Sequence, residues 1–150
     1  MSKEQYLVEI IKDLEQSFWD ERGLGARYRT TLVGVEYFKR KYGADLSDKS
    51  WRNTLQNVVN VLVKEGIVEK AEFQGSGHVL LLNLQGCIHL SIEKELAEKN
   101  IPPFSCPCAN VAMHYLDLLI GLNSELVSVE LKSDHCAVTI GIAGQALEEV

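Results

Sequence analysis

The chain has 150 residues, and its 15 basic and 21 acidic side chains give a formal net charge of −6 at neutral pH. A single domain of this length buries roughly 68–70% of the surface that its unfolded chain exposes, so neither disulfides nor a structural metal are required for folding. The acidic balance argues against a general nucleic-acid or membrane-surface binder, because such proteins collect basic residues to meet phosphate.

No segment has the pattern of a membrane span or a signal peptide. The longest aliphatic runs, such as 79–82, are far shorter than the ~20 residues that a span needs. Residues 1–5 mix charged side chains into what would have to be an apolar stretch. We therefore expect a cytoplasmic protein, whose four cysteines are reduced rather than bridged.

Helical periodicity dominates the first half of the chain. Ser2 and Gln5 form a capping box, which predicts a first helix from there to about residue 20. A second helix is expected to end at Gly43, and a third is expected over 50–66, with Ser50 as its cap. The apolar residues predicted to share one face of the second helix are Tyr28, Leu32, Val35, Phe38 and Tyr42.

The second half mixes strands and helices. The pattern predicts a hairpin over 67–84, turned at 74–77, and a second hairpin over 126–142. Between them, 91–100 is typical of a short helix and 105–121 of a longer one, capped by Ser105. We expect one α+β domain over residues 1–150, with a helical N-terminal half and an antiparallel sheet built from two hairpins, on which the long cysteine-led helix packs.

Chemistry is most strongly indicated at Cys106 and Cys108, which flank a proline at the start of that long helix. The positive end of a helix dipole lowers the pKa of a thiol placed there, which favours metal binding or nucleophilic reactions. Cys108 also begins the apolar face of the helix, so it is equally a candidate core residue. Cys136 shares a strand face with apolar residues and approaches Cys106 or Cys108 if the last hairpin packs beside the helix start. The spacing C-x-C is weaker evidence for zinc than two C-x-x-C pairs.

Aromatic side chains on several helices are numerous enough to line an apolar cavity. Phe38, Trp51 and Tyr115 are our candidates for a ligand pocket. The alternative is that each of them simply fills the core.

The order of these elements resembles the vinyl-4-reductase domain family over roughly residues 26–142. The likeness runs from a helix ending at 64–68, through a hairpin and Gly86-Cys87, to the cysteine-led helix and a final hairpin. In that family a glutamate is followed three residues later by a cysteine, and eight residues after that by a second cysteine. Here these positions hold Glu125, Ser128 and Cys136.

The resemblance implies a small domain that dimerises and encloses an apolar pocket, as in the ligand-sensing parts of aromatic-responsive transcription activators. It also implies a metal, usually zinc, held by a helix cysteine, the glutamate and the two hairpin cysteines. On this chain those ligands are Cys106 or Cys108, Glu125 and Cys136, with Ser128 in place of one thiol. Since serine is a poor zinc ligand, both Cys106 and Cys108 are needed to supply a third sulfur.

Our leading hypothesis is a non-enzymatic domain that binds or senses an apolar small molecule as a homodimer, with residues 1–25 as an N-terminal helix available for dimerisation. The alternative is a winged-helix DNA-binding regulator, in which 51–64 is the recognition helix and the first hairpin is the wing. Acidic residues interrupt the basic ones there, so phosphate binding is expected to be weak. A thiol or metal redox enzyme centred on Cys106 and Cys108 is a third possibility.

Overall fold

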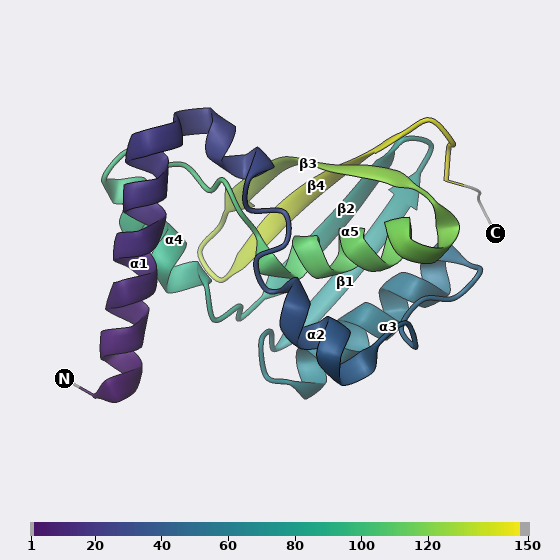
Figure 1. Cartoon of the computed structure of the whole chain (residues 1–150), viewed down its shortest axis with the longest axis horizontal. Coiled ribbons are helices and arrows are strands. Elements are labelled where there is room, and N and C mark those ends of the chain that lie inside the picture. Colours follow the sequence, from purple (N-terminus) through teal and green to yellow (C-terminus); the bar gives the residue numbers. More distant parts are fainter. Residues whose placement is uncertain (1, 148–150) are drawn as a thin grey trace.

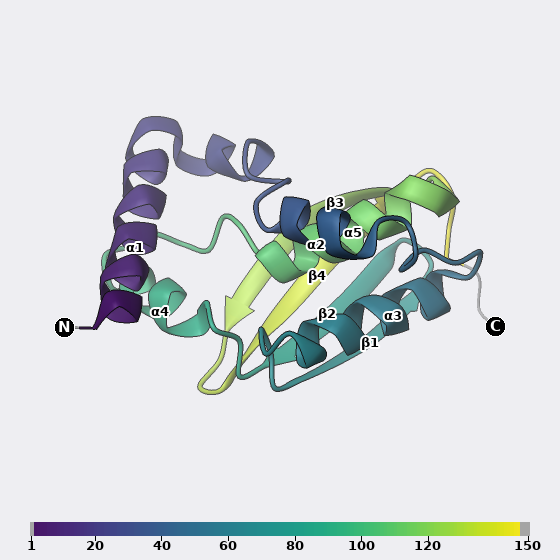
Figure 2. The same cartoon turned by 60° about the horizontal axis from the view of Figure 1, so that its bottom comes forward.

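The computed structural model describes residues 2–147 and shows a four-stranded sheet with helices against one of its faces (Figures 1 and 2). The helices are α1 (Lys3–Arg22), α2 (Val35–Tyr42), α3 (Trp51–Lys64), α4 (Leu90–Glu98) and α5 (Pro107–Ile120), and a 3₁₀ helix, η1, covers Gly23–Tyr28. The strands are β1 (Lys70–Ser76), β2 (Val79–Gln85), β3 (Asn123–Leu131) and β4 (His135–Ala143). The predicted α+β class with two hairpins is confirmed.

The two hairpins lie side by side in the order β1-β2-β4-β3, with every neighbouring pair antiparallel. Side chains alternate between the two faces of a strand, and in β2 and β4 every second residue is buried under the helices. The buried set is Leu80, Leu82, Leu84, Cys136, Val138, Ile140 and Ile142. Because β2 pairs with β4, the first hairpin is an integral part of this sheet rather than a projecting wing.

Two helices of the first half begin as the sequence predicts. The Gln5 amide donates to the Ser2 hydroxyl at 3.1 Å, and the Ser2 amide donates to the Gln5 side chain at 2.8 Å, so the capping box is confirmed. The Ser50 hydroxyl accepts from the Asn53 amide at 3.4 Å and caps α3. The first and third helices are therefore encoded locally.

The predicted second helix is wrong in its first half. Only Val35–Tyr42 is helical, and residues 29–34 form turns instead. Gly34 has a φ of +86°, in the left-handed region, and a Cβ atom there would lie 2.8 Å from the Pro107 Cβ. Glycine is required at this close approach, and its conformation interrupts the helix. Tyr28 and Leu32 are consequently 60% exposed rather than part of a buried face.

Two smaller predictions also need correction. The cap of α5 is Cys106, whose sulfur accepts from the Ala109 amide at 3.4 Å, and not Ser105. The first hairpin turns through the two residues Gly77 and His78, so its strands run further into the glycine-containing segment than predicted. Gly77 has a φ of +59°, which is the conformation that a two-residue turn with glycine at its first position requires.

Helix α1 lies at one end of the molecule beside α4 (Figure 1), and none of its residues is fully buried. Phe18 and Trp19 stack on Phe104 with ring centroids 6.3 and 6.0 Å apart, which fixes the second half of the helix. Large apolar residues on the rest of α1 are exposed: Tyr6, Leu7, Val8, Ile11 and Leu14. Across residues 2–147, no helix combines the length and apolarity that crossing a bilayer demands.

Candidate functional site

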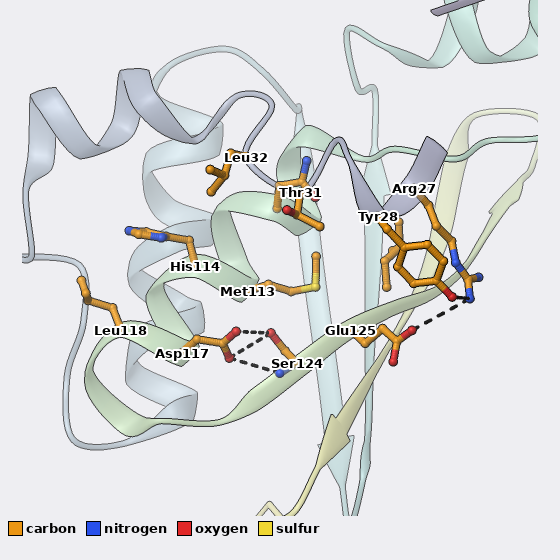
Figure 3. Close-up of a pocket in the computed structure, with 12 residues that line it drawn as sticks. Arg27, Tyr28, Thr31, Leu32, Met113, His114, Asp117, Leu118, Ser124 and Glu125 are labelled. Carbon is orange, nitrogen blue, oxygen red and sulfur yellow. Dashed lines mark hydrogen bonds and ion pairs between the residues drawn. The ribbon is translucent and has the colours of Figure 1, made fainter. Parts of the chain in front are cut away.

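A groove of about 650 Å³ lies between α5, strand β3 and the segment that runs from η1 towards α2 (Figure 3). Its lining combines apolar side chains from all three elements with a small number of polar groups. Figure 3 shows Met113 extending from α5 into the space beside Tyr28. The lining residues are Arg27, Tyr28, Thr31, Leu32, Asn110, Met113, His114, Asp117, Leu118, Ser124, Glu125 and Leu126.

Asn110 holds one wall of the groove in place. This α5 residue is 2% exposed, and its side-chain amide donates to the backbone carbonyls of Thr30 at 2.8 Å and Val33 at 3.1 Å. Both carbonyls belong to the turns that replace the predicted helix, so a buried side chain adds to the few backbone hydrogen bonds of this segment. Sequence reasoning missed Asn110, because nothing near it in the chain indicates this role.

An ion pair closes one end of the groove. The Arg27 guanidinium donates to the Tyr28 hydroxyl at 2.8 Å and lies 3.9 Å from the Glu125 carboxylate (Figure 3). The Glu125 side chain is 62% exposed, so solvent screens the pair and it contributes little to stability. Its effect is to place one cation and one anion at a defined position of the groove.

Asp117 and His114 supply further polar groups from α5. The Ser124 hydroxyl donates to the Asp117 carboxylate at 2.9 Å, and the Ser124 amide donates to it at 3.2 Å. Burial raises the pKa of Asp117, an effect that these hydrogen bonds oppose. Burial, followed by the nearby Lys39 charge, lowers the pKa of His114 and favours the neutral imidazole. The groove therefore offers hydrogen-bonding groups among apolar surfaces.

The four cysteines converge on a different part of the core. Cys136 pairs across the sheet with Leu84, Cys87 follows Leu84 by three residues, and Cys106 and Cys108 begin α5. All four are free and buried, and they belong to one core cluster. Cys106, Cys108 and Cys136 thus share one core cluster, which also includes Cys87. A contact between Cys136 and the start of α5 stays a prediction.

These thiols differ in their acidity. Burial raises the pKa of Cys106 to about 12 and that of Cys136 to about 11. The interaction between Cys87 and Cys108 lowers the pKa of Cys87 to about 7 and raises the pKa of Cys108. At neutral pH the cluster is therefore rich in protonated thiols.

Glu125 does not reach this cluster. It pairs with Gly141 of β4, whereas Cys136 lies five residues back along that strand, about 16 Å away at ~3.3 Å per residue. Ser128 is exposed on β3. Among residues 2–147, no group of three or more His, Cys, Asp and Glu side chains is arranged to hold a metal ion. The ligand set that the family resemblance implies does not fit this arrangement.

The three predicted pocket residues lie in the core and not along the groove. The Tyr115 hydroxyl donates to the carbonyls of Gly43 at 2.8 Å and Phe38 at 3.2 Å, which ties α5 to the middle and the C-terminal end of α2. Trp51 packs edge-on against Phe73, with ring centroids 6.3 Å apart. Phe38 is also buried, but it lines a second, smaller pocket near Cys108.

A pair of carboxyl groups joins α1 to α4 beside the thiol cluster. Glu93 of α4 is 7% exposed and interacts with Glu15 of α1. Burial, then the interaction with Glu15, raises the pKa of Glu93, and burial also raises the pKa of Glu15. The shift of the Glu93 pKa favours its protonated form.

Comparison with known proteins gives one informative likeness. No family model matches the sequence, and neither does any curated protein. A solved structure that matches is the crystal structure of the phenol-responsive sensory domain of the transcription activator PoxR with phenol, with a TM-score of 0.60. The alignment covers 90% of this chain and 73% of that one, at 15% sequence identity. At this identity the likeness shows the fold, and membership of the vinyl-4-reductase family stays a prediction.

Proposed function

We propose that the chain is a non-enzymatic small-molecule-binding or sensing domain, and that the groove beside α5 receives an apolar molecule with a polar substituent. The observation that supports this most directly is the apolar surface around the groove. Tyr28 and Leu32 are each 60% exposed and Leu118 is 53% exposed, although all three are large and lie together. Clustered exposed apolar side chains around a concave surface are typical of a ligand site.

The polar groups of the groove indicate which polar substituent the ligand carries. The neutral His114 imidazole and the Asp117 carboxylate can hydrogen-bond a hydroxyl group, while Arg27 suits an acidic substituent. The volume of about 650 Å³ lies within the ordinary range for small-molecule sites. The shared fold with a domain described as phenol-responsive supports a substituted aromatic ring as the first class to test.

The proposal includes a homodimer formed through α1. The exposed residues Leu7, Ile11 and Leu14 recur at spacings of four and three, which places them on one face of the helix. A second copy of the chain offers the same face, so two helices can cover each other. Four reduced cysteines also suit the reducing cytoplasm, where we place the protein. The zinc that the family resemblance implies has no part in the proposal.

Titration with phenol, benzoate and 2-naphthol, followed by calorimetry and native mass spectrometry, tests the groove. The variant Leu32→Asp introduces a charge into its wall, and Leu24→Asp is the matched control on an exposed residue of η1 outside the lining. We expect Leu32→Asp to weaken binding of a bound probe roughly tenfold, equivalent to about 1.4 kcal/mol, and Leu24→Asp to leave it unchanged. Equal effects of the two variants, or no binding of any probe, would contradict the proposal.

A further inference from the structure

A second cavity, which we call the small pocket, lies between α2, the end of α3, the loop after β2 and the first turns of α5. Its volume is about 190 Å³, and its most buried lining residues are apolar and at most 3% exposed. They are Phe38, Leu62, Cys108 and Val111. Engineered apolar cavities of about 150 Å³ stay dry and bind benzene, so the small pocket has the size for one aromatic ring.

Hydrogen bonds fix the residues that line the opening of the small pocket. Tyr37 is 44% exposed, and its hydroxyl donates to the Glu65 carboxylate at 2.9 Å and accepts from the Lys41 ammonium at 3.2 Å. Ile88, in the loop after β2, is 57% exposed, and its amide donates to the Ile67 carbonyl at 3.0 Å. The pocket is therefore formed without a ligand, which lowers the cost of binding one.

The chemistry of the lining favours an uncharged aromatic ligand. The rings of Tyr37 and Phe38 lie at 89° to each other with centroids 5.3 Å apart, and both are available for packing against a further ring. Among the residues that the structure describes, no carboxylate, lysine or arginine lines the small pocket. Burial lowers the pKa of His89 and favours its neutral imidazole, so this lining residue adds no charge at neutral pH.

We propose that the small pocket is a second ligand site, which takes a one-ring aromatic hydrocarbon of the size of benzene. Such a molecule carries no group that needs a hydrogen bond, and the small pocket offers it apolar surface. The groove beside α5 differs, because Arg27 and Glu125 place opposite charges at its end. The two cavities have no lining residue in common, so this proposal goes beyond the proposed function and does not depend on it.

Methyl NMR of the full chain with benzene tests the proposal, because an aromatic ring shifts the signals of methyl groups beside it. We expect shifts at Leu62, Ile67 and Val111, which line the small pocket, and smaller ones at Leu32 and Leu118 in the groove. The dissociation constant should be on the order of 1 mM, since so small a ligand makes few contacts.

A variant at the opening tests the location separately. Ile88→Asp places a carboxylate beside the ligand and should weaken benzene binding roughly tenfold, whereas Leu24→Asp, at an exposed position outside both cavities, should leave it unchanged. Shifts in both sets of methyl groups support the proposal only if Ile88→Asp removes those of the small pocket and leaves those of the groove. No shifts, shifts confined to the groove or to the exposed leucines of α1, or equal effects of the two variants would overturn it.

Discussion

Asn110 and Thr30 are joined by a hydrogen bond of 2.8 Å between a side-chain amide and a backbone carbonyl. The same amide group bonds Val33, so one buried residue of α5 fixes the segment that forms a wall of the groove. A turn segment without regular backbone pairing is thereby held in one position, which a binding site requires.

Replacing Asn110 with leucine should therefore loosen this wall. Asn110→Leu has a similar volume but removes the side-chain donor to the Val33 carbonyl and leaves the Thr30 carbonyl with the Val33 amide alone, and we expect a loss of about 1–3 kcal/mol in the free energy of unfolding. Urea denaturation measures this loss, and phenol titration should show weaker binding if phenol is a bound probe. Asn60→Leu, at an exposed position of α3, is the control. Equal stabilities of the two variants would contradict the role of Asn110.

Tyr115 provides a second test, because the sequence suggested it as a pocket residue and the structure places it in the core. Tyr115→Phe keeps the ring but removes the donor to Gly43 and Phe38, so stability should fall by about 1–3 kcal/mol. Binding of a probe in the groove should not change. Tyr6→Phe, on the exposed face of α1, controls for the lost hydroxyl. A loss of binding free energy larger than the loss in the free energy of unfolding would indicate that Tyr115 contacts the ligand.

Elements whose signals are local were predictable from the sequence. The capping box at Ser2, the cap at Ser50 and the alternation of β2 and β4 depend on residues a few positions apart. The segment 29–34 was mispredicted because its conformation depends on Pro107 and Asn110, which are distant in the chain. Apolar spacing alone could not show that tertiary contacts would override a helix there.

The candidate site was less predictable than the fold. The presence of Cys106, Cys108 and Cys136 in one core cluster followed from the expected packing of a helix on a hairpin. The inclusion of Cys87 did not, because it depends on β2 pairing with β4 rather than on any spacing. Glu125 was assigned from a family pattern, but strand register places it opposite Gly141 and away from the thiols.

The register between β3 and β4 predicts that the protein holds little zinc. Since Glu125 is about 16 Å along the strand from Cys136, the implied zinc site lacks its carboxylate. We expect purified protein to hold far less than one zinc per chain by elemental analysis, and a chelator to leave the melting temperature unchanged. Zinc at near-stoichiometric level, released by the chelator with a fall in melting temperature, would show that the thiols rearrange around a metal.

If the protein dimerises through α1, a charge on the exposed face of this helix should separate the two copies. Leu14→Glu should convert a dimer into a monomer, because Leu14 is 65% exposed and a carboxylate cannot be buried there without a partner. Light scattering coupled to size exclusion measures the molecular mass directly. Leu24→Glu changes an equally apolar exposed residue outside α1 and should leave the mass unchanged. A monomeric parent protein, or a dimer that survives Leu14→Glu, would exclude this interface.

The buried carboxyl pair makes stability depend on pH in a defined direction. Burial, then the interaction with Glu15, raises the pKa of Glu93 from an ordinary 4.5 to about 9. The folded state keeps this proton across a range in which the unfolded state has lost it, so the free energy of unfolding should fall as the pH rises from 4.5 to 9. Glu93→Gln cannot ionise and should flatten this fall, gaining more than 1 kcal/mol at pH 8, since each pKa unit is worth about 1.4 kcal/mol. Urea denaturation between pH 5 and pH 9 measures the slope, with Glu98→Gln, exposed on the same helix, as the control. An unchanged slope in Glu93→Gln would mean that Glu93 is ionised in the folded protein.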